Sequence, residues 1–67
     1  MARLLLIDTD VLVDFFRGSG EAVDFVNTNS DRIILSSIVV AELYAGVKGD
    51  SEQYVLENFV SLFRVIP

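Results

Sequence analysis

Short runs of apolar residues punctuate the chain and are separated by longer segments in which apolar residues recur with helical spacing. The first run, residues 3–7, is too apolar to alternate, so it predicts a buried strand that is covered on both faces. A second apolar run, rich in branched residues, covers 32–35, and residues 65–66 begin a third. These three runs predict the strands of a parallel sheet.

Two helices are predicted between the first and second strands. The first follows residues 3–7 almost without a loop, and its apolar stripe consists of Val11, Leu12, Phe15 and Phe16. Thr9 or Asp10 is its expected N-cap, and Gly18 its expected end. Ser19 is expected to cap the second helix, which ends in a polar run at 27–31.

Two further helices are predicted between the second and third strands. Ser37 is the expected cap of a helix that begins near Val39 and runs to about Val47. Ser51 is the expected cap of the next, whose stripe consists of Val55, Leu56, Phe59, Leu62 and Phe63. The resulting order β-α-α-β-α-α-β predicts an α/β fold with part of a three-layer, open parallel sheet.

The composition suggests that this sheet does not stand alone. The chain has 67 residues, of which 52% are hydrophobic. A chain of this size buries only roughly 60% of the surface that it exposes when unfolded. We therefore expect either an obligate partner or a further segment of the fold.

Residue types that are missing from the sequence limit the metal sites and catalytic pairs that the protein can form. The chain contains no cysteine, histidine or tryptophan. Disulfides, zinc sites built from Cys or His, and Ser-His or Cys-His catalytic pairs are therefore excluded. Any metal ion must be held by oxygen atoms.

Charge and targeting signals bear on partners and location. Ten acidic residues against five basic ones give a net charge of −5, which by itself argues against a nucleic-acid-binding protein. The basic residues are scattered along the chain, at Arg3, Arg17, Arg32, Lys48 and Arg64.

The first apolar run is too short for a signal peptide, and no run approaches the ~18 residues of a membrane span. We expect a soluble, cytoplasmic protein with no membrane partner.

Two acidic residues stand in strongly apolar surroundings, close to the ends of predicted strands. Asp8 directly follows the first strand, and Glu42 comes shortly after the second. In parallel sheets, ligands bind beyond the carboxyl ends of the strands, so neighbouring strands would bring both carboxylates to one edge. Two carboxylates so close repel each other unless a cation lies between them, and Mg²⁺ or Mn²⁺ suits oxygen ligands.

Simpler interpretations of these two residues remain open. Asp8 could serve only as the N-cap of the first helix, a common role for aspartate. Glu42 could be a solvated residue on the outer face of its helix, or it could pair with Arg17 or Lys48.

Two blocks of sequence resemble the first half of a PIN domain, in particular the VapC-type toxins. The first block is LLIDTDVLV at 5–13, a hydrophobic strand that ends in Asp-Thr. The second is LSSIVVAELYAG at 35–46, in which a strand ends in Ser and a Glu-Leu pair precedes a Gly. The closing LFRVIP at 62–67 is similar to the third strand of that family, so the resemblance covers the whole chain.

The resemblance implies a metal-dependent endoribonuclease that is the toxic half of a toxin–antitoxin pair. Such proteins act on RNA, are usually homodimers, and are neutralised by a small antitoxin protein inserted into the active-site groove. Asp8 and Glu42 match the first two metal-binding acids of the family, as catalytic and metal-binding residues. Thr9 and Ser36 match supporting hydrogen-bonding residues, and the implied cofactor is Mg²⁺ or Mn²⁺.

The family pattern also includes two further acidic residues in a second half of the domain, together with the strands that complete the sheet. By this comparison, residues 1–67 are expected to form the N-terminal half of a single PIN-like domain, with the C-terminal half absent. The chain alone is then expected to be inactive. It should persist as a dimer, as a domain-swapped assembly, or beside a complementing C-terminal fragment.

Two other functions are compatible with parts of the pattern. A strand ending in Asp-x-Asp is similar to the first motif of haloacid-dehalogenase-type phosphatases, with Asp8 as nucleophile, Asp10 as acid/base and Ser36 binding phosphate. Asp10→Asn would then abolish activity, whereas a PIN-like nuclease should tolerate it. A non-catalytic interaction module would instead keep its folding and binding in Asp8→Ala, and Mn²⁺ would not raise its melting temperature.

Overall fold

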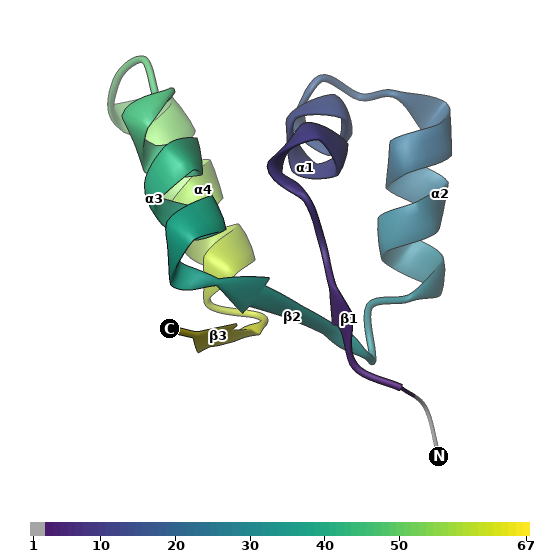
Figure 1. Ribbon diagram of the computed structural model, residues 1–67. Coiled ribbons are helices and arrows are strands. Elements are labelled where there is room, and N and C mark those ends of the chain that lie inside the picture. Colours follow the sequence, from purple (N-terminus) through teal and green to yellow (C-terminus); the bar gives the residue numbers. More distant parts are fainter. Residues whose placement is uncertain (1–2) are drawn as a thin grey trace.

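The computed structural model describes residues 3–67, which form three strands and four helices in the order β-α-α-β-α-α-β (Figure 1). The strands are β1 (Leu5–Leu6), β2 (Ile33–Ser36) and β3 (Arg64–Ile66). The helices are α1 (Thr9–Phe16), α2 (Gly20–Thr28), α3 (Ser37–Ala45) and α4 (Asp50–Val60). The α/β class and the order of elements that the sequence predicts are confirmed.

The three strands form one parallel sheet in the order β1-β2-β3. In this register Leu6 lies beside Ile34, and Ile34 lies beside Arg64. Both crossovers step in the same direction across the sheet, and right-handed connections of that kind place their helices on the same face. Figure 1 accordingly shows all four helices on one side of the strands.

The hydrophobic core lies between the sheet and these helices. Leu35 from the centre of β2 and Leu12 from α1 are completely buried. The other buried members of the cluster come from β2, from α2, α3 and α4, and from the residue that follows β1, namely Ile7, Val26, Ile33, Leu43, Leu56 and Phe59. Because every helix contributes to this cluster, the core holds the α1–α2 pair and the α3–α4 pair against the same face of the sheet.

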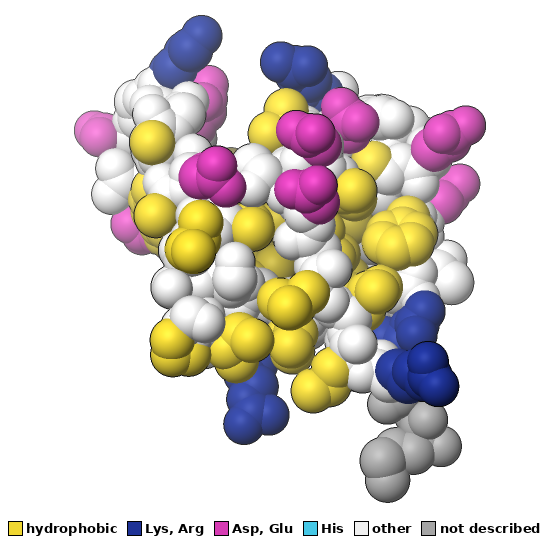
Figure 2. Space-filling view, in the orientation of Figure 1, with side chains coloured by type: hydrophobic (Ala, Val, Ile, Leu, Met, Phe, Trp, Pro, Cys, Tyr) yellow, Lys and Arg dark blue, Asp and Glu magenta, His cyan; other side chains and the backbone are white. Residues whose placement is uncertain are grey.

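The opposite face of the sheet carries no helix, which corrects the expectation of a first strand covered on both faces. Leu4 and Leu6 point away from the core and are 62% and 56% exposed. The regular part of the strand is also shorter than predicted, at Leu5–Leu6. The physical cause is the crossover direction, which brings all four helices to one face and leaves β1 at the edge of the sheet. Figure 2 shows hydrophobic side chains gathered in the lower part of the molecule, around the strands.

The N-caps of α1, α3 and α4 each differ from the prediction by one or two residues, and that of α1 is Asp8. The N-cap of α3 is Ser36, whose Oγ accepts a hydrogen bond from the Val39 backbone N–H at 3.1 Å, rather than Ser37. The reason is that β2 passes directly into α3, so Ser37 is already helical. The N-cap position of α4 is Gly49, with φ of 109°, rather than Ser51. Glycine accepts this backbone conformation without strain.

The ends and remaining caps agree more closely. Ser19 takes the N-cap position of α2, as predicted, although its side chain makes no capping hydrogen bond. Gly18 follows the end of α1 with φ of 82°, which suits its predicted role as a stop. The helix expected to run to about Val47 ends at Ala45, with Gly46 as its C-cap. None of the helices formed within residues 3–67 has the length and hydropathy that a membrane span requires.

Candidate functional site

Asp8 lies in the short connection between β1 and α1, directly before the first residue of α1. The preceding residue, Ile7, is buried in the core, whereas Asp8 itself is exposed. Asp8 occupies the N-cap position of α1, with φ of −73° and ψ of 151°, in place of the predicted Thr9 or Asp10. Its side chain, however, makes no capping hydrogen bond. Capping therefore accounts for the position of Asp8 but does not engage its carboxylate.

A side-chain hydrogen bond joins the start of α1 to the second turn of α3. The Thr9 hydroxyl donates to Oε1 of Glu42 at 2.7 Å, across 33 positions of sequence. The contact follows from the topology, because β1 and β2 are parallel neighbours and the helices after them, α1 and α3, begin at the same edge of the sheet. The structure therefore brings Thr9, the residue that follows Asp8, into contact with Glu42.

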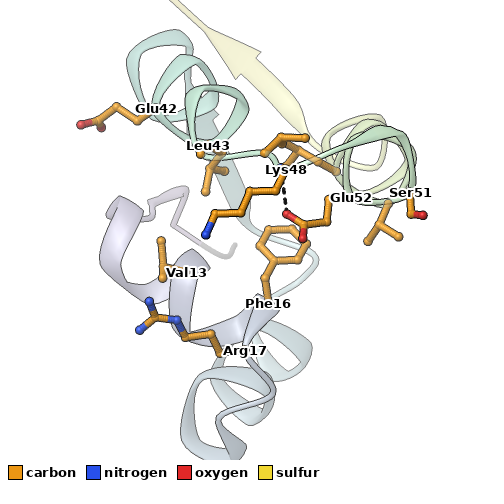
Figure 3. Close-up of a pocket in the computed structure, with 12 residues that line it drawn as sticks. Val13, Phe16, Arg17, Glu42, Leu43, Lys48, Ser51 and Glu52 are labelled. Atoms are coloured by element: carbon orange, nitrogen blue, oxygen red, sulfur yellow. Dashed lines mark hydrogen bonds between the residues drawn. The ribbon is translucent and has the colours of Figure 1, made fainter.

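This hydrogen bond also bears on the alternative interpretations of Glu42. Figure 3 shows the Glu42 carboxylate pointing away from the ammonium group of Lys48 and from the guanidinium group of Arg17. The hydrogen-bond donor that orients Glu42 is Thr9 rather than either of these basic residues. Glu42 is exposed, so its second carboxylate oxygen remains accessible to solvent or to a ligand.

Ser36 lies at the same edge of the sheet, and its side chain caps the helix that follows it. It is the last residue of β2, is half-buried, and caps α3 through its hydroxyl oxygen. The hydrogen bond to Val39 uses Ser36 as an acceptor, so its hydroxyl proton is not consumed by the cap. The observed hydrogen bond of Ser36 is structural, and the supporting role that the resemblance implies for it stays a prediction.

The donors at this edge fit a hard divalent cation in part. They are oxygen atoms only, from two carboxylates and neighbouring hydroxyl groups, the ligand type that Mg²⁺ and Mn²⁺ prefer. Across residues 3–67 no group of three or more Asp, Glu, His or Cys side chains is placed to hold a metal ion. Mg²⁺ is commonly held by one or two carboxylates together with water and substrate phosphate, so two carboxylates suit that limited role.

A groove adjoins this edge, and the sequence alone did not reveal it. It has a volume of about 560 Å³ and lies between α1, α3 and α4 (Figure 3). Glu42 lines it, together with Arg17 and Lys48, two of the basic residues that look scattered in the sequence. The sequence offered one indication that these two residues lie near each other. Arg17 follows α1 and Lys48 follows α3, and both helices start at the edge of the sheet that carries the site.

Comparison with known proteins identifies the family. The searches of curated proteins and of solved structures gave no match. The sequence model of the PIN domain matches residues 5–67, which is all of the chain beyond its fourth residue. Nothing in these comparisons favours the phosphatase interpretation, and Asp10, on which it depends, is exposed in the first turn of α1. The protein belongs to the PIN domain family, which indicates a function of the nuclease type.

Proposed function

We propose that this protein is a metal-dependent endoribonuclease of the toxin–antitoxin type, related to the VapC toxins, with Asp8 and Glu42 as its catalytic, metal-binding carboxylates. The observation that carries the proposal is the hydrogen bond of 2.7 Å from Thr9, the residue that follows Asp8, to Glu42 in α3. PIN domains depend in general on divalent metal ions, and the oxygen donors at this edge suit Mg²⁺ or Mn²⁺.

Each residue of the site has a distinct role in this proposal. Asp8 presents its carboxylate from a backbone position that the start of α1 defines. Thr9 holds one oxygen of Glu42 and leaves the other available, and Ser36 supports the same edge from the end of β2. A divalent ion, when bound, lowers the pKa of a coordinated water and stabilises negative charge that develops on the phosphate.

The uncovered face of the sheet supports the further proposal that residues 1–67 are the N-terminal half of the complete domain. Parallel sheets are normally covered on both faces, yet Leu4 and Leu6 are mostly exposed. A complementing C-terminal segment, in the same or another chain, would cover this face and add acidic ligands. The 67-residue chain alone is accordingly expected to bind metal weakly and to be inactive.

Partners and location follow from the same proposal. The substrate is RNA, the protein acts in the cytoplasm, and a small antitoxin neutralises it by occupying the groove beside Glu42. A homodimer is the expected assembly. Where no complementing segment covers the exposed apolar side chains of β1, the association of two chains would bury them.

The first measurement is native mass spectrometry of the purified protein, which reports covalent length and assembly together. An assembly that includes a complementing segment or an added chain is then tested for RNA cleavage with Mn²⁺. We expect Asp8→Asn and Glu42→Gln to abolish cleavage and Asp10→Asn to retain it. If only 67-residue chains are present, we expect no cleavage and a small rise in melting temperature with Mn²⁺ that both site variants lose.

Asp10→Asn is the matched control, because Asp10 is an exposed acid two residues from Asp8 on the same helix start. Loss of activity in Asp10→Asn with retention in Glu42→Gln would favour the phosphatase instead. A melting temperature that Mn²⁺ does not change, with folding intact in Asp8→Ala, would favour the non-catalytic interaction module.

A further inference from the structure

The groove beside Glu42 has the dimensions of a binding site. Its volume of about 560 Å³ falls within the ~300–1,000 Å³ of pockets that hold small molecules. Its walls are largely apolar, with Val13 from α1, Leu43 from α3 and Val55 from α4. Because Glu42 also lines the groove, a ligand bound there would be continuous with the carboxylate site.

Two cationic side chains meet at this groove from distant parts of the chain. Arg17 directly follows α1, and Lys48 lies in the connection between α3 and α4. Figure 3 shows the Lys48 side chain reaching across the groove towards α1, the helix that Arg17 follows. The neighbouring carboxylate of Glu52 accepts a hydrogen bond from the Lys48 backbone N–H at 3.1 Å. This bond holds the Glu52 carboxylate on the α4 side of the groove. Both cations therefore line the groove, Arg17 from the end of α1 and Lys48 from the connection between α3 and α4.

An aromatic ring forms part of the same wall. Phe16 is 38% exposed, and its ring packs nearly perpendicular to Phe15 and Phe59, at interplanar angles of 82° and 71°. These two contacts hold the ring in one orientation before any ligand arrives. Aromatic side chains held in this way provide stacking platforms for the bases of single-stranded nucleic acids.

We infer that this groove binds the stretch of single-stranded RNA next to the phosphate that is cleaved, with Arg17 and Lys48 contacting backbone phosphates and Phe16 stacking on a base. The inference rests on the proposed function, because it identifies how the substrate reaches Asp8 and Glu42. Glu42 and Glu52 also line the groove, so its lining carries no net positive charge and its attraction for a polyanion requires direct contacts with Arg17 and Lys48. Binding depends on where the cations are placed rather than on their number.

The test measures the affinity of a fluorescent 12-nucleotide single-stranded RNA by anisotropy, in EDTA, between 20 and 150 mM KCl. For single strands, the slope of log affinity against log salt changes by roughly 0.7 per phosphate contact. We expect the Arg17→Gln/Lys48→Gln double variant to have a slope shallower by about 1.4. The matched control is Arg3→Gln/Arg64→Gln, which removes the same charge from residues outside the groove and should keep the wild-type slope.

Phe16 is tested by a pair of substitutions. Phe16→Leu should weaken binding roughly fivefold to a hundredfold at every salt concentration while leaving the slope unchanged. Phe16→Trp keeps an aromatic surface and should retain binding. Circular dichroism melts of each variant establish that it is folded, and the charge variants alter exposed side chains only.

The inference is overturned if the wild-type chain does not bind the RNA, or if both double variants have the same slope. Because the measurement is made without metal, it is independent of cleavage. A slope that depends on Arg17 and Lys48, in an assembly that includes a complementing segment yet does not cleave RNA with Mn²⁺, would refute the nuclease but not the groove. Cleavage that depends on Asp8, with no slope difference, would refute the groove alone.

Discussion

Removing the Thr9 hydroxyl tests whether Thr9 supports metal binding by orienting the Glu42 carboxylate. Thr9→Val keeps the branched shape of the side chain but deletes the donor of the 2.7 Å hydrogen bond. A hydrogen bond to a charged group contributes about 1.5–3 kcal/mol where the partner is buried. Glu42 is exposed and can be rehydrated, so the free energy of unfolding should fall by less than about 1 kcal/mol.

The effect on metal binding should be much larger than the effect on stability. Substituting residues that orient a metal ligand typically costs about 10–100-fold in metal affinity. We therefore expect the dissociation constant for Mn²⁺, measured by calorimetric titration on the assembly found by native mass spectrometry, to rise by about that factor in Thr9→Val. Urea denaturation of the same samples gives the change in unfolding free energy.

Two controls make this result decisive. Thr9→Ser retains a hydroxyl and should keep most of the affinity for Mn²⁺. In a Glu42→Gln background, Thr9→Val should cause little further loss, because the residue that Thr9 orients has already been altered. Equal Mn²⁺ affinities for Thr9→Val and Thr9→Ser would refute the positioning role of Thr9. A fall of more than about 2 kcal/mol in stability would show that the hydrogen bond mainly supports the fold.

Two further predictions concern the fold. Leu35→Ala should lower the free energy of unfolding in urea by about 2–5 kcal/mol, because Leu35 is completely buried. Leu62→Ala, at a side chain that is 76% exposed, should change it by less than about 0.5 kcal/mol, and equal losses would contradict the observed burial. Ser36→Ala should cost about 1 kcal/mol by removing the hydrogen bond to Val39, whereas Ser37→Ala should be nearly neutral. The reverse order in the same denaturation assay would place the N-cap of α3 at Ser37.

The order of strands and helices could be predicted because it depends on local patterns. Helical spacing of apolar residues and short apolar runs are properties of neighbouring positions, and all seven elements appear where these patterns lie. The caps were less predictable. Whether Ser36 or Ser37 begins α3 depends on how directly β2 turns into the helix, and a difference of one residue leaves the pattern unchanged.

Part of the candidate site could also be predicted. Asp8 and Glu42 stand out because acids are unusual in such apolar surroundings, and a parallel sheet was expected to bring strand ends together. The contact from Thr9 to Glu42 depends on the packing of α1 beside α3. The groove residues Arg17 and Lys48 carried no comparable signal, because isolated basic residues after helices are common on protein surfaces.

The sequence by itself determined the types and order of the elements, and it restricted any metal chemistry to oxygen ligands through its lack of cysteine and histidine. Only the tertiary structure decided that all four helices lie on one face of the sheet, that Leu4 and Leu6 are therefore exposed, and that Arg17 and Lys48 line one groove. The physical reason is the range of the interactions. Secondary structure follows from side chains a few positions apart, whereas crossover direction and helix packing bring together residues that are distant in sequence.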